Sequence, residues 1–293
     1  MTSLILDNKT LKNWPVITAL VTPFRDGAVD LKALSFLLKK QQDQGCAALI
    51  LGSTGEAFSL TADERASVLD LSISMDLRVP LVVGVTDCSY ARVLDNIKQA
   101  NQRNIQAILV SLPPYFRPGP AGQKEFFQSV LDHSEHPVIL YNHPGRAGVV
   151  IDPSVVAALV GHPKLLAVKH SAPDRASLKL LRQQAPTVPV YLGDDALFFD
   201  YCSEGVVGLI SVMANAWPGK TKAYVEGCMN GTITAPLDVF DGLEQAVNPL
   251  PIKGVLSLMY DIQPDVRLPL SFKDLSDKAL LEKAIDYMAN WTT

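Results

Sequence analysis

Eight short apolar runs recur along the chain at intervals of roughly 25 to 30 residues, the length of one β/α unit. They are residues 16–24, 47–53, 80–85, 107–113, 137–142, 165–171, 188–194 and 206–212. The segments between them have helical periodicity, and strands that alternate with helices predict a parallel sheet. Eight such units predict an α/β fold, a (β/α)8 TIM barrel rather than an open sheet.

Local signals place helix boundaries between the apolar runs. The periodic segment 31–44 is followed by a glycine, which commonly terminates helices. Thr61 has Glu64 three residues later, which is the signature of a capping box at a helix start. Asp152 precedes a proline, the pairing of a capping residue with proline at the first helical position. Each signal agrees with the predicted alternation.

The chain divides into two predicted parts. Residues 1–230 form the predicted catalytic barrel, and residues 231–293 form a predicted C-terminal helical region. Two proline-containing stretches, AVNPLPIK and VRLPLS, interrupt this region. No extended linker precedes it, so we expect its helices to pack onto the barrel. No GxGxxG follows the first apolar run, which weakens a dinucleotide-binding alternative.

Composition argues against several classes of function. The chain has 293 residues, 48% of them hydrophobic, and a formal net charge of −4 with acidic and basic residues well mixed. A nucleic-acid-binding surface needs a basic patch, so no nucleic-acid partner is predicted. The five histidines lack metal-binding spacing and the four cysteines contain no CxxC pair, so no metal site is predicted.

The apolar runs are too short to cross a membrane, since none approaches the ~20 residues that a span requires. The N-terminus lacks the basic and apolar regions of a secretion signal. The widely spaced cysteines are typical of reduced thiols in an intracellular protein. We therefore expect a soluble cytoplasmic protein without a membrane partner.

Reactive side chains follow the apolar runs at their carboxyl ends. In a (β/α)8 barrel, these strand ends and the loops after them carry the chemistry. The residues concerned are Ser53, Thr54, Tyr115, Tyr141, Arg146, Lys169, Gly193, Asp194, Asp195 and Ile210. We therefore expect them to gather at one rim of the barrel.

Lys169 closes the apolar stretch LLAVK, where an ammonium group is costly unless it is paired or kept neutral. An ion-paired lysine at the rim is one interpretation. The other is a Schiff-base nucleophile, because desolvation lowers the pKa of a lysine and makes its neutral amine available near pH 7. A neutral amine attacks a ketone, and the resulting iminium acts as an electron sink.

Hydroxyl groups near Lys169 also have two interpretations each. Tyr141 is either an amphipathic barrel residue or a proton carrier, since a phenol both donates and accepts. The GSTGE segment, residues 52–56, is either a simple glycine turn or an anion cradle. In the cradle, backbone N–H groups and the hydroxyls of Ser53 and Thr54 hold a carboxylate.

Charged residues complete the predicted rim. Arg146 is either a surface arginine or a bidentate receptor for the carboxylate of a second substrate. Asp194 and Asp195 resemble paired acids or metal ligands, but the sequence offers no third ligand. We therefore favour hydrogen bonds that order their loop.

Motifs spread over nearly the whole chain resemble the dihydrodipicolinate synthase / N-acetylneuraminate lyase family, which are class I (Schiff-base) aldolases of pyruvate. They are ALVTPF (19–24), GSTGEA (52–57), YNHPGRAG (141–148), VKHS (168–171), LGDDA (192–196), GLISVMAN (208–215), NPLPIK (248–253) and RLPL (267–270), in the order and spacing of the family. The sialic acid lyases lack the arginine found here at position 146. The resemblance therefore favours the synthase branch of the family.

The resemblance implies four catalytic residues. Lys169 would form the imine with pyruvate, and Tyr141 would be the central proton carrier. Ser53 would link Tyr141 to Tyr115 in a hydrogen-bonded relay. In the family, the tyrosine at the place of Tyr115 enters the site of the neighbouring subunit. The resemblance thus implies at least a dimer, with a homotetramer, a dimer of dimers, as the family norm.

The resemblance also implies the substrate-binding residues. Thr54 and the adjacent backbone would bind the carboxylate of pyruvate. Arg146 would receive the carboxylate of the second substrate. The backbone at Gly193 and Ile210 would complete the pocket. No metal or dissociable cofactor is implied, because the lysine itself supplies the electron sink.

The chain departs from the family pattern at several positions. Ser53 stands where synthases usually have threonine, and serine is commoner in the lyase branch. PPYFRP replaces the usual PYYNRP, so Tyr115 holds the relay position unless a gap places Phe116 there. His170 stands where synthases usually have glutamate, and His143 where they often have an aliphatic residue. Either histidine alters the pocket of the second substrate or simply packs.

The implied reaction is the condensation of pyruvate with L-aspartate-4-semialdehyde to 4-hydroxy-tetrahydrodipicolinate, a step of lysine and diaminopimelate biosynthesis. An alternative uses the same imine to cleave or dehydrate a 2-keto-3-deoxy sugar acid or a related keto acid, and Ser53, His143 and His170 keep it open. A more remote alternative is a non-catalytic binding protein on the same fold. The presence of both Lys169 and Tyr141 argues against it.

Overall fold

A computed structural model of the chain describes residue 4 and residues 6–292. Within this part of the chain, eight parallel strands form a closed barrel in the order β1-β10-β9-β8-β7-β6-β5-β4. The strands are β1 (Val16–Ala19), β4 (Ala47–Ile50), β5 (Leu81–Gly84), β6 (Ala107–Ser111), β7 (Val138–Asn142), β8 (Leu165–His170), β9 (Val190–Leu192) and β10 (Gly208–Ser211). Each strand lies inside one of the eight predicted runs, so the predicted (β/α)8 barrel is confirmed.

Two further strands form a hairpin that the sequence analysis missed. β2 (Phe24–Arg25) pairs antiparallel with β3 (Ala28–Val29) just after the first barrel strand. Asp26 and Gly27 between them have φ angles of 53° and 80°, the left-handed geometry of a tight hairpin turn. The Asp-Gly pair was a readable signal for this hairpin, but Phe24, the first residue of β2, is also the last residue of the apolar run 16–24, which was interpreted as one strand.

Helices fill the segments between the strands. They are α1 (Leu31–Asp43), α2 (Ala62–Ser74), α3 (Tyr90–Asn101), α4 (Pro120–His133), α5 (Pro144–Ala147), α6 (Pro153–Leu159), α7 (Arg175–Gln184), α8 (Phe198–Tyr201), α9 (Pro218–Asn230), α10 (Phe240–Glu244), α11 (Leu250–Met259) and α12 (Lys278–Asn290). Short 3-10 segments are Leu11–Asn13, Ala57–Ser59, Cys202–Glu204, Met213–Asn215 and Phe272–Asp274. The stretch NPLPIK, expected as an interruption, instead contains the start of α11.

The predicted helix starts are confirmed in atomic detail. The backbone N–H of Glu64 donates to the Thr61 hydroxyl at 3.3 Å, and the Glu64 carboxylate accepts from the Thr61 N–H at 2.9 Å, so the capping box of α2 is complete. The Asp152 carboxylate accepts from the backbone N–H of Ser154 at 2.8 Å and caps α6. These bonds satisfy backbone donors that a helix start leaves without partners.

The fold contains two compact units. One consists of residues 80–210 with the described residues up to 14, and the other of residues 15–79 with 211–292. The predicted boundary at residue 230 between a barrel and a C-terminal region stays a prediction.

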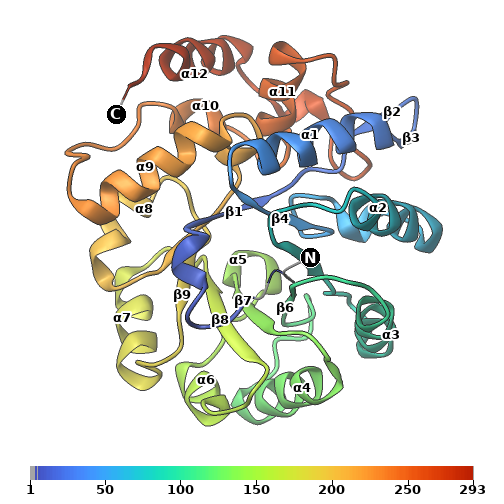
Figure 1. Cartoon of the computed structure of the whole chain (residues 1–293), viewed down its shortest axis with the longest axis vertical. Helices are drawn as coiled ribbons and strands as arrows, with labels where there is room; N and C mark the ends of the chain where they lie inside the picture. The colour runs from blue at the N-terminus through green and yellow to red at the C-terminus, as the bar shows by residue number, and fades with distance from the viewer. Residues whose placement is uncertain (1–3, 5, 293) are drawn as a thin grey trace. The chain divides into compact units, whose positions relative to one another are not determined.

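The first unit carries β5 to β9 and most of β10. Its strands pair in parallel, and their register sets the Cα atom of Lys169 beside those of Tyr141 on β7 and Tyr191 on β9. Helices α3, α4, α6 and α7 pack one against the next (Figure 1). The Tyr191 hydroxyl donates to the carbonyls of Leu11 at 3.2 Å and Trp14 at 3.0 Å, which ties the N-terminal segment to β9.

The second unit carries the β1–β4 pair, the hairpin and the C-terminal helices. α1 packs against α2, and α10, α11 and α12 pack together (Figure 1). The α1 face that is buried consists of Ala33, Leu34, Leu37, Leu38 and Gln41, at helical spacing. The Asn215 side chain accepts from the N–H of Val21 at 2.9 Å and donates to the carbonyl of Ala19 at 2.8 Å, which secures the chain after β1.

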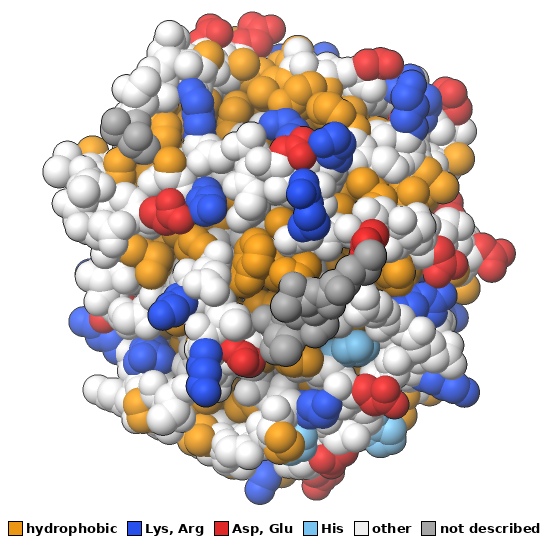
Figure 2. All heavy atoms as spheres, in the orientation of Figure 1, with side chains coloured by type: hydrophobic (Ala, Val, Ile, Leu, Met, Phe, Trp, Pro, Cys, Tyr) orange, Lys and Arg blue, Asp and Glu red, His pale blue; other side chains and the backbone are white. Residues whose placement is uncertain are grey.

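Charged side chains of both signs are scattered over the face seen in Figure 2. This agrees with the mixed charge pattern of the sequence. Among the described residues, no helix combines the length and the apolar character needed to cross a membrane.

Candidate active site

Lys169 is buried one residue before the end of β8. It is 4% exposed, and the strands β7 and β9 flank β8 on either side. Its three predecessors, Leu166, Ala167 and Val168, are buried as well. The apolar strand therefore carries the lysine into the protein interior, as its sequence predicts.

Burial makes the ammonium group of Lys169 more acidic than that of an exposed lysine. Burial lowers the pKa of Lys169 from 10.5 to about 7, and Asp195 and Asp194 oppose this shift while Arg146 adds to it. Within the described residues, no side chain or carbonyl accepts a hydrogen bond from this amine. A substantial fraction of Lys169 is therefore neutral at physiological pH, the form that attacks a carbonyl.

Tyr141 lies beside Lys169 on the neighbouring strand. The Lys169 Nζ is 4.3 Å from the centroid of the Tyr141 ring, so the structure brings these two predicted residues together. Burial raises the pKa of Tyr141 to about 12, and the charge of Arg146 and the nearby Ser171 hydroxyl oppose the shift. The phenol therefore keeps its proton and can donate it to a nearby oxygen.

Gly193 follows β9 and presses directly against the lysine. A Cβ at this position would lie 2.4 Å from Lys169 Cε and 2.1 Å from Ser171 Oγ, so no larger residue fits without a rearrangement. Its N–H donates to the carbonyl of His170 at 2.9 Å. Gly193 thus makes room for the lysine side chain.

Ile210, which was also predicted to complete the pocket, lies in β10 and is fully buried.

Arg146 lies on α5, the single helical turn that follows β7. The turn begins at Pro144 and ends at Gly148, whose φ of 77° suits a glycine. Arg146 is exposed, yet its charge lowers the pKa values of both Lys169 and Tyr141. A guanidinium in this place can receive a carboxylate from solution.

Asp194 orders the loop after β9. Its carboxylate accepts a hydrogen bond from the N–H of Leu197 at 3.1 Å. Asp195 is the largest charge that raises the pKa of Lys169. The loop-ordering role expected for Asp194 is therefore confirmed, and the pair also moderates the acidity of the lysine.

The GSTGE segment belongs to the second unit and follows β4. Thr54 is 5% exposed, and its hydroxyl accepts a hydrogen bond from Asn248 Nδ2 at 2.9 Å. This bond uses the oxygen as acceptor and leaves the Thr54 O–H free to donate to an anion. Ser53, next to it, is half-buried. Asn248 belongs to the NPLPIK motif, but its place beside Thr54 could not be predicted from the sequence.

Tyr115 lies in the segment between β6 and α4 and faces solvent. It is 89% exposed with a φ of 84°, an uncommon conformation for a residue other than glycine. Its ring meets that of Phe116 edge-on at 6.0 Å, and Phe116 is 66% exposed. The predicted relay through Tyr115 stays a prediction, as does the alternative placement on Phe116.

Ser171 is a site residue that the sequence analysis missed. It comes two residues after Lys169, and successive residues of a strand point to opposite faces, so the side chains of 169 and 171 share one face. Its hydroxyl contributes to the acidity of Tyr141. The spacing to Lys169 was the signal that could have identified it.

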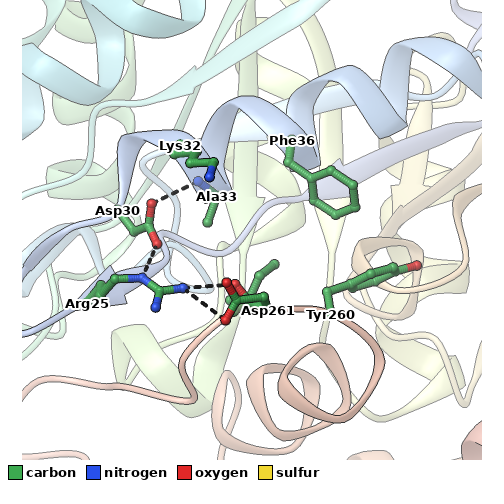
Figure 3. Close-up of a pocket in the computed structure, with 8 residues that line it drawn as sticks. Arg25, Asp30, Lys32, Ala33, Phe36, Tyr260 and Asp261 are labelled. Carbon is green, nitrogen blue, oxygen red and sulfur yellow. Dashed lines mark hydrogen bonds and ion pairs between the residues drawn. The ribbon is translucent and has the colours of Figure 1, made fainter.

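A separate pocket of about 590 Å³ lies within the second unit (Figure 3). Arg25 Nε donates to Asp30 at 2.9 Å, and its Nη2 donates to the carbonyl of Asp261 at 2.9 Å. The rings of Phe36 and Tyr260 meet edge-on at 5.1 Å. This pocket contains none of the predicted site residues, and its arginine is engaged by neighbouring side chains and backbone.

Within the described residues, no group of three or more His, Cys, Asp or Glu side chains is arranged to hold a metal ion. Near the end of β8, Lys169 supplies a buried amine whose pKa is lowered to about 7. On a (β/α)8 barrel, a buried lysine with a neutral amine and an adjacent phenol defines a Schiff-base, class I aldolase type of enzyme. Residues 12–288 match the dihydrodipicolinate synthetase family, and the chain belongs to this family.

Known proteins of similar sequence and structure agree with this assignment. The 4-hydroxy-tetrahydrodipicolinate synthase of Francisella philomiragia is 36% identical over 281 residues, which cover 94% of this chain and 95% of that protein. The chloride-inhibited dihydrodipicolinate synthase of Acinetobacter baumannii, solved with pyruvate, has a TM-score of 0.86 at 28% identity, covering 94% of this chain and 99% of that one. A monomeric dihydrodipicolinate synthase variant also has a TM-score of 0.86 at 28% identity, covering 96% and 98%.

Proposed function

We propose that this enzyme condenses pyruvate with L-aspartate-4-semialdehyde to give 4-hydroxy-tetrahydrodipicolinate. The observation that carries the proposal is the Lys169 amine, buried 4.3 Å from the Tyr141 ring with its pKa lowered to about 7. Membership of the dihydrodipicolinate synthetase family and relatives named as synthases of this product support the choice of substrates.

The first half of the reaction forms the nucleophile. The neutral Lys169 amine attacks the keto carbon of pyruvate, and Tyr141 donates the proton with which the carbinolamine hydroxyl leaves as water. The resulting iminium withdraws electrons, so the methyl group loses a proton to the Tyr141 phenolate that the loss of water left behind, and an enamine forms. No dissociable cofactor is required in this proposal, because the iminium nitrogen accepts the electron pair.

The second half joins the two substrates. The enamine carbon attacks the aldehyde of aspartate semialdehyde, a carbon–carbon bond forms, and the aldehyde oxygen takes a proton to become the hydroxyl of the product. The amine of the same substrate then replaces Lys169 on the imine carbon. This exchange closes the ring and returns the lysine as a free amine.

The remaining site residues have proposed roles that follow the resemblance to the family. Thr54 binds the carboxylate of pyruvate through the O–H that its bond with Asn248 leaves available. Arg146 receives the carboxylate of aspartate semialdehyde. The backbone at Gly193 and Ile210 lines the pocket. Ser53 and Tyr115 connect Tyr141 to a proton relay completed by a second copy of the chain.

The proposal extends to assembly and location. The exposed Tyr115 fits an enzyme whose relay is completed between subunits, and a homotetramer built as a dimer of dimers follows from the family resemblance. A biosynthetic enzyme with these small-molecule substrates is proposed to act in the cytoplasm. Sedimentation analysis measures the assembly directly, and a monomer with full activity would exclude the shared relay.

A coupled assay tests the function. Pyruvate and aspartate semialdehyde are supplied, and product is consumed by the NADPH-dependent reductase that follows in the pathway. We expect turnover that falls by more than about 10³-fold in Lys169→Ala, because the nucleophile is lost. Absence of turnover, with a pyruvate adduct still trapped on Lys169 by borohydride, would retain the lysine chemistry and point to keto sugar acids as substrates. Absence of any adduct would exclude the proposal.

A further inference from the structure

Two histidines, His143 and His170, lie next to the tyrosine and the lysine of the site. The hydrogen bonding of their ring nitrogens differs. His170 directly follows Lys169 and is 1% exposed. Its Nδ1 lies 3.3 Å from Asn142 Nδ2, and its Nε2 lies 3.1 Å from the Ser177 hydroxyl. Both nitrogens therefore have partners within the protein, so His170 is a packed residue that joins β8 to β7 and α7.

His143 lacks such partners. It is half-buried directly before α5, and its Nδ1 is buried without a hydrogen bond to any described residue. Its ring meets the Tyr141 ring edge-on, with centroids 5.6 Å apart and planes 85° apart. A Cβ on Gly145 would lie 3.2 Å from His143 Cε1, so the glycine lets the turn approach the ring closely. A buried ring nitrogen beside Tyr141 that has no hydrogen bond from the described residues is costly unless a ligand supplies one.

Two positively charged side chains of the site, Arg146 and Lys169, act on His143. Burial lowers the pKa of His143 to about 4, and the charges of Arg146 and Lys169 lower it further in that order. The imidazole is therefore neutral, with one nitrogen that accepts hydrogen bonds. The ring lies in the electrostatic field of both Arg146, the proposed carboxylate receptor, and Lys169, the proposed nucleophile.

We propose that His143 is a specificity residue that accepts a hydrogen bond from the amine of the second substrate while Arg146 holds the carboxylate. The inference rests on the proposed function. Aspartate semialdehyde carries its amine and carboxylate on one carbon, so the two receptors must be neighbours, and here they are three residues apart around one helical turn. The substrate ammonium can only donate, arginine cannot accept, and the neutral imidazole can. Pyruvate has no amine, so His143 acts on the second substrate alone.

The test separates recognition of the substrate amine from pyruvate binding and imine formation. His143→Phe keeps a flat ring and removes both nitrogens. We expect the KM for aspartate semialdehyde to rise about tenfold or more, as for loss of a hydrogen bond to a charged group. The KM for pyruvate and the yield of the borohydride-trapped adduct should stay within about twofold. His143→Leu makes the same test if the phenylalanine variant does not fold.

A substrate analogue without the amine sharpens the test. Competitive inhibition by 4-oxobutanoate, which keeps the aldehyde and the carboxylate, should be the same in the wild type and in His143→Phe. His143→Asn sets a polar atom near the place of Nδ1, and His143→Gln sets one near Nε2. At least one of them should restore much of the affinity for aspartate semialdehyde and show which nitrogen acts.

His170→Phe is the matched control. Its nitrogens are engaged internally, so we expect a lower melting temperature with an unchanged KM for aspartate semialdehyde. An unchanged KM in His143→Phe, an equal rise in the KM for pyruvate, or no recovery in either amide variant would overturn the inference. If the wild type forms the pyruvate adduct but does not use aspartate semialdehyde, the proposed function fails first and the inference fails with it.

Discussion

Lys169 in the first unit and Lys253 in the second are both buried lysines, and the comparison shows how differently two buried amines are surrounded. Lys253 is 1% exposed, and its amine donates to Glu56 at 2.5 Å and to the carbonyl of Asp265 at 2.8 Å. Lys169 is 4% exposed and donates to no described residue. Burial lowers the pKa of Lys253 to about 8, with Glu56 opposing, so that lysine stays charged at neutral pH.

The environment of Lys253 is a closed structural network. The second oxygen of Glu56 accepts from the N–H of Arg267 at 3.0 Å, and the Arg267 guanidinium forms an ion pair with Glu64. Lys253 and Arg267 also lie over the Phe24 ring, at 4.2 and 4.5 Å from its centroid. The NPLPIK and RLPL motifs thus hold the GSTGE turn through Glu56. Burial is common to both lysines, and the hydrogen-bonded carboxylate of Glu56 is what distinguishes Lys253 from the proposed nucleophile Lys169.

Replacing each lysine by methionine should have opposite effects on stability, and this is the largest effect that we expect. Lys253→Met leaves the Glu56 charge buried without its partner, which should lower the free energy of unfolding by about 3–5 kcal/mol. Lys169→Met removes an amine whose charged form is disfavoured by burial, so the free energy of unfolding should not fall. Denaturant unfolding of both variants measures the difference.

The size of the Lys169 effect on stability depends on pH. Below pH about 7 the amine is charged in both the folded and the unfolded chain, and the folded state carries the full cost of burial. Between about 7 and 10.5 the folded state gives up its proton and this cost shrinks. The gain in stability from Lys169→Met should therefore be greater at pH 6 than at pH 9. Equal losses of stability in both methionine variants would contradict the contrast between the lysines.

The pH dependence of imine formation sharpens the same comparison. With limiting pyruvate, the initial rate of adduct formation should rise about tenfold per pH unit below the Lys169 pKa and level off above about 7. Borohydride quenching followed by peptide mass spectrometry measures the rate and locates the adduct. A rate that still rises steeply at pH 9, or label on Lys253, would show that the amine of Lys169 is not the neutral nucleophile.

The smallest expected effect concerns the hydrogen bond that orients Thr54. Asn248→Ala removes the donor to the Thr54 hydroxyl, and loss of one such bond should raise the KM for pyruvate by about two- to tenfold. Steady-state kinetics measure this change. Thr54→Val is the control, and adding Asn248→Ala to it should cause little further change. Additive effects of the two substitutions would mean that Asn248 does not act through Thr54.

Much of the fold follows from local sequence signals. The eight strands were readable because buried parallel strands are short, continuous apolar runs, and the starts of α2 and α6 were readable from their capping residues. The β2–β3 hairpin was missed because its first strand continues an apolar run. The start of α11 was missed because a motif with two prolines suggests an interruption, although proline is well tolerated in a first helical turn.

The sequence by itself determined where Lys169 and Tyr141 lie, because both residues come at the ends of apolar strands at neighbouring places in the barrel. It did not determine the hydrogen-bond and ion-pair partners of the buried polar groups, on which their protonation depends. Lys253 meets Glu56 across 197 residues of chain, and His143 and His170 look alike until their neighbours are known. Only the tertiary structure brings such partners together. Since the acidity of a buried group depends on the charges and hydrogen bonds around it, only that structure separates the proposed nucleophile Lys169 from the ion-paired Lys253.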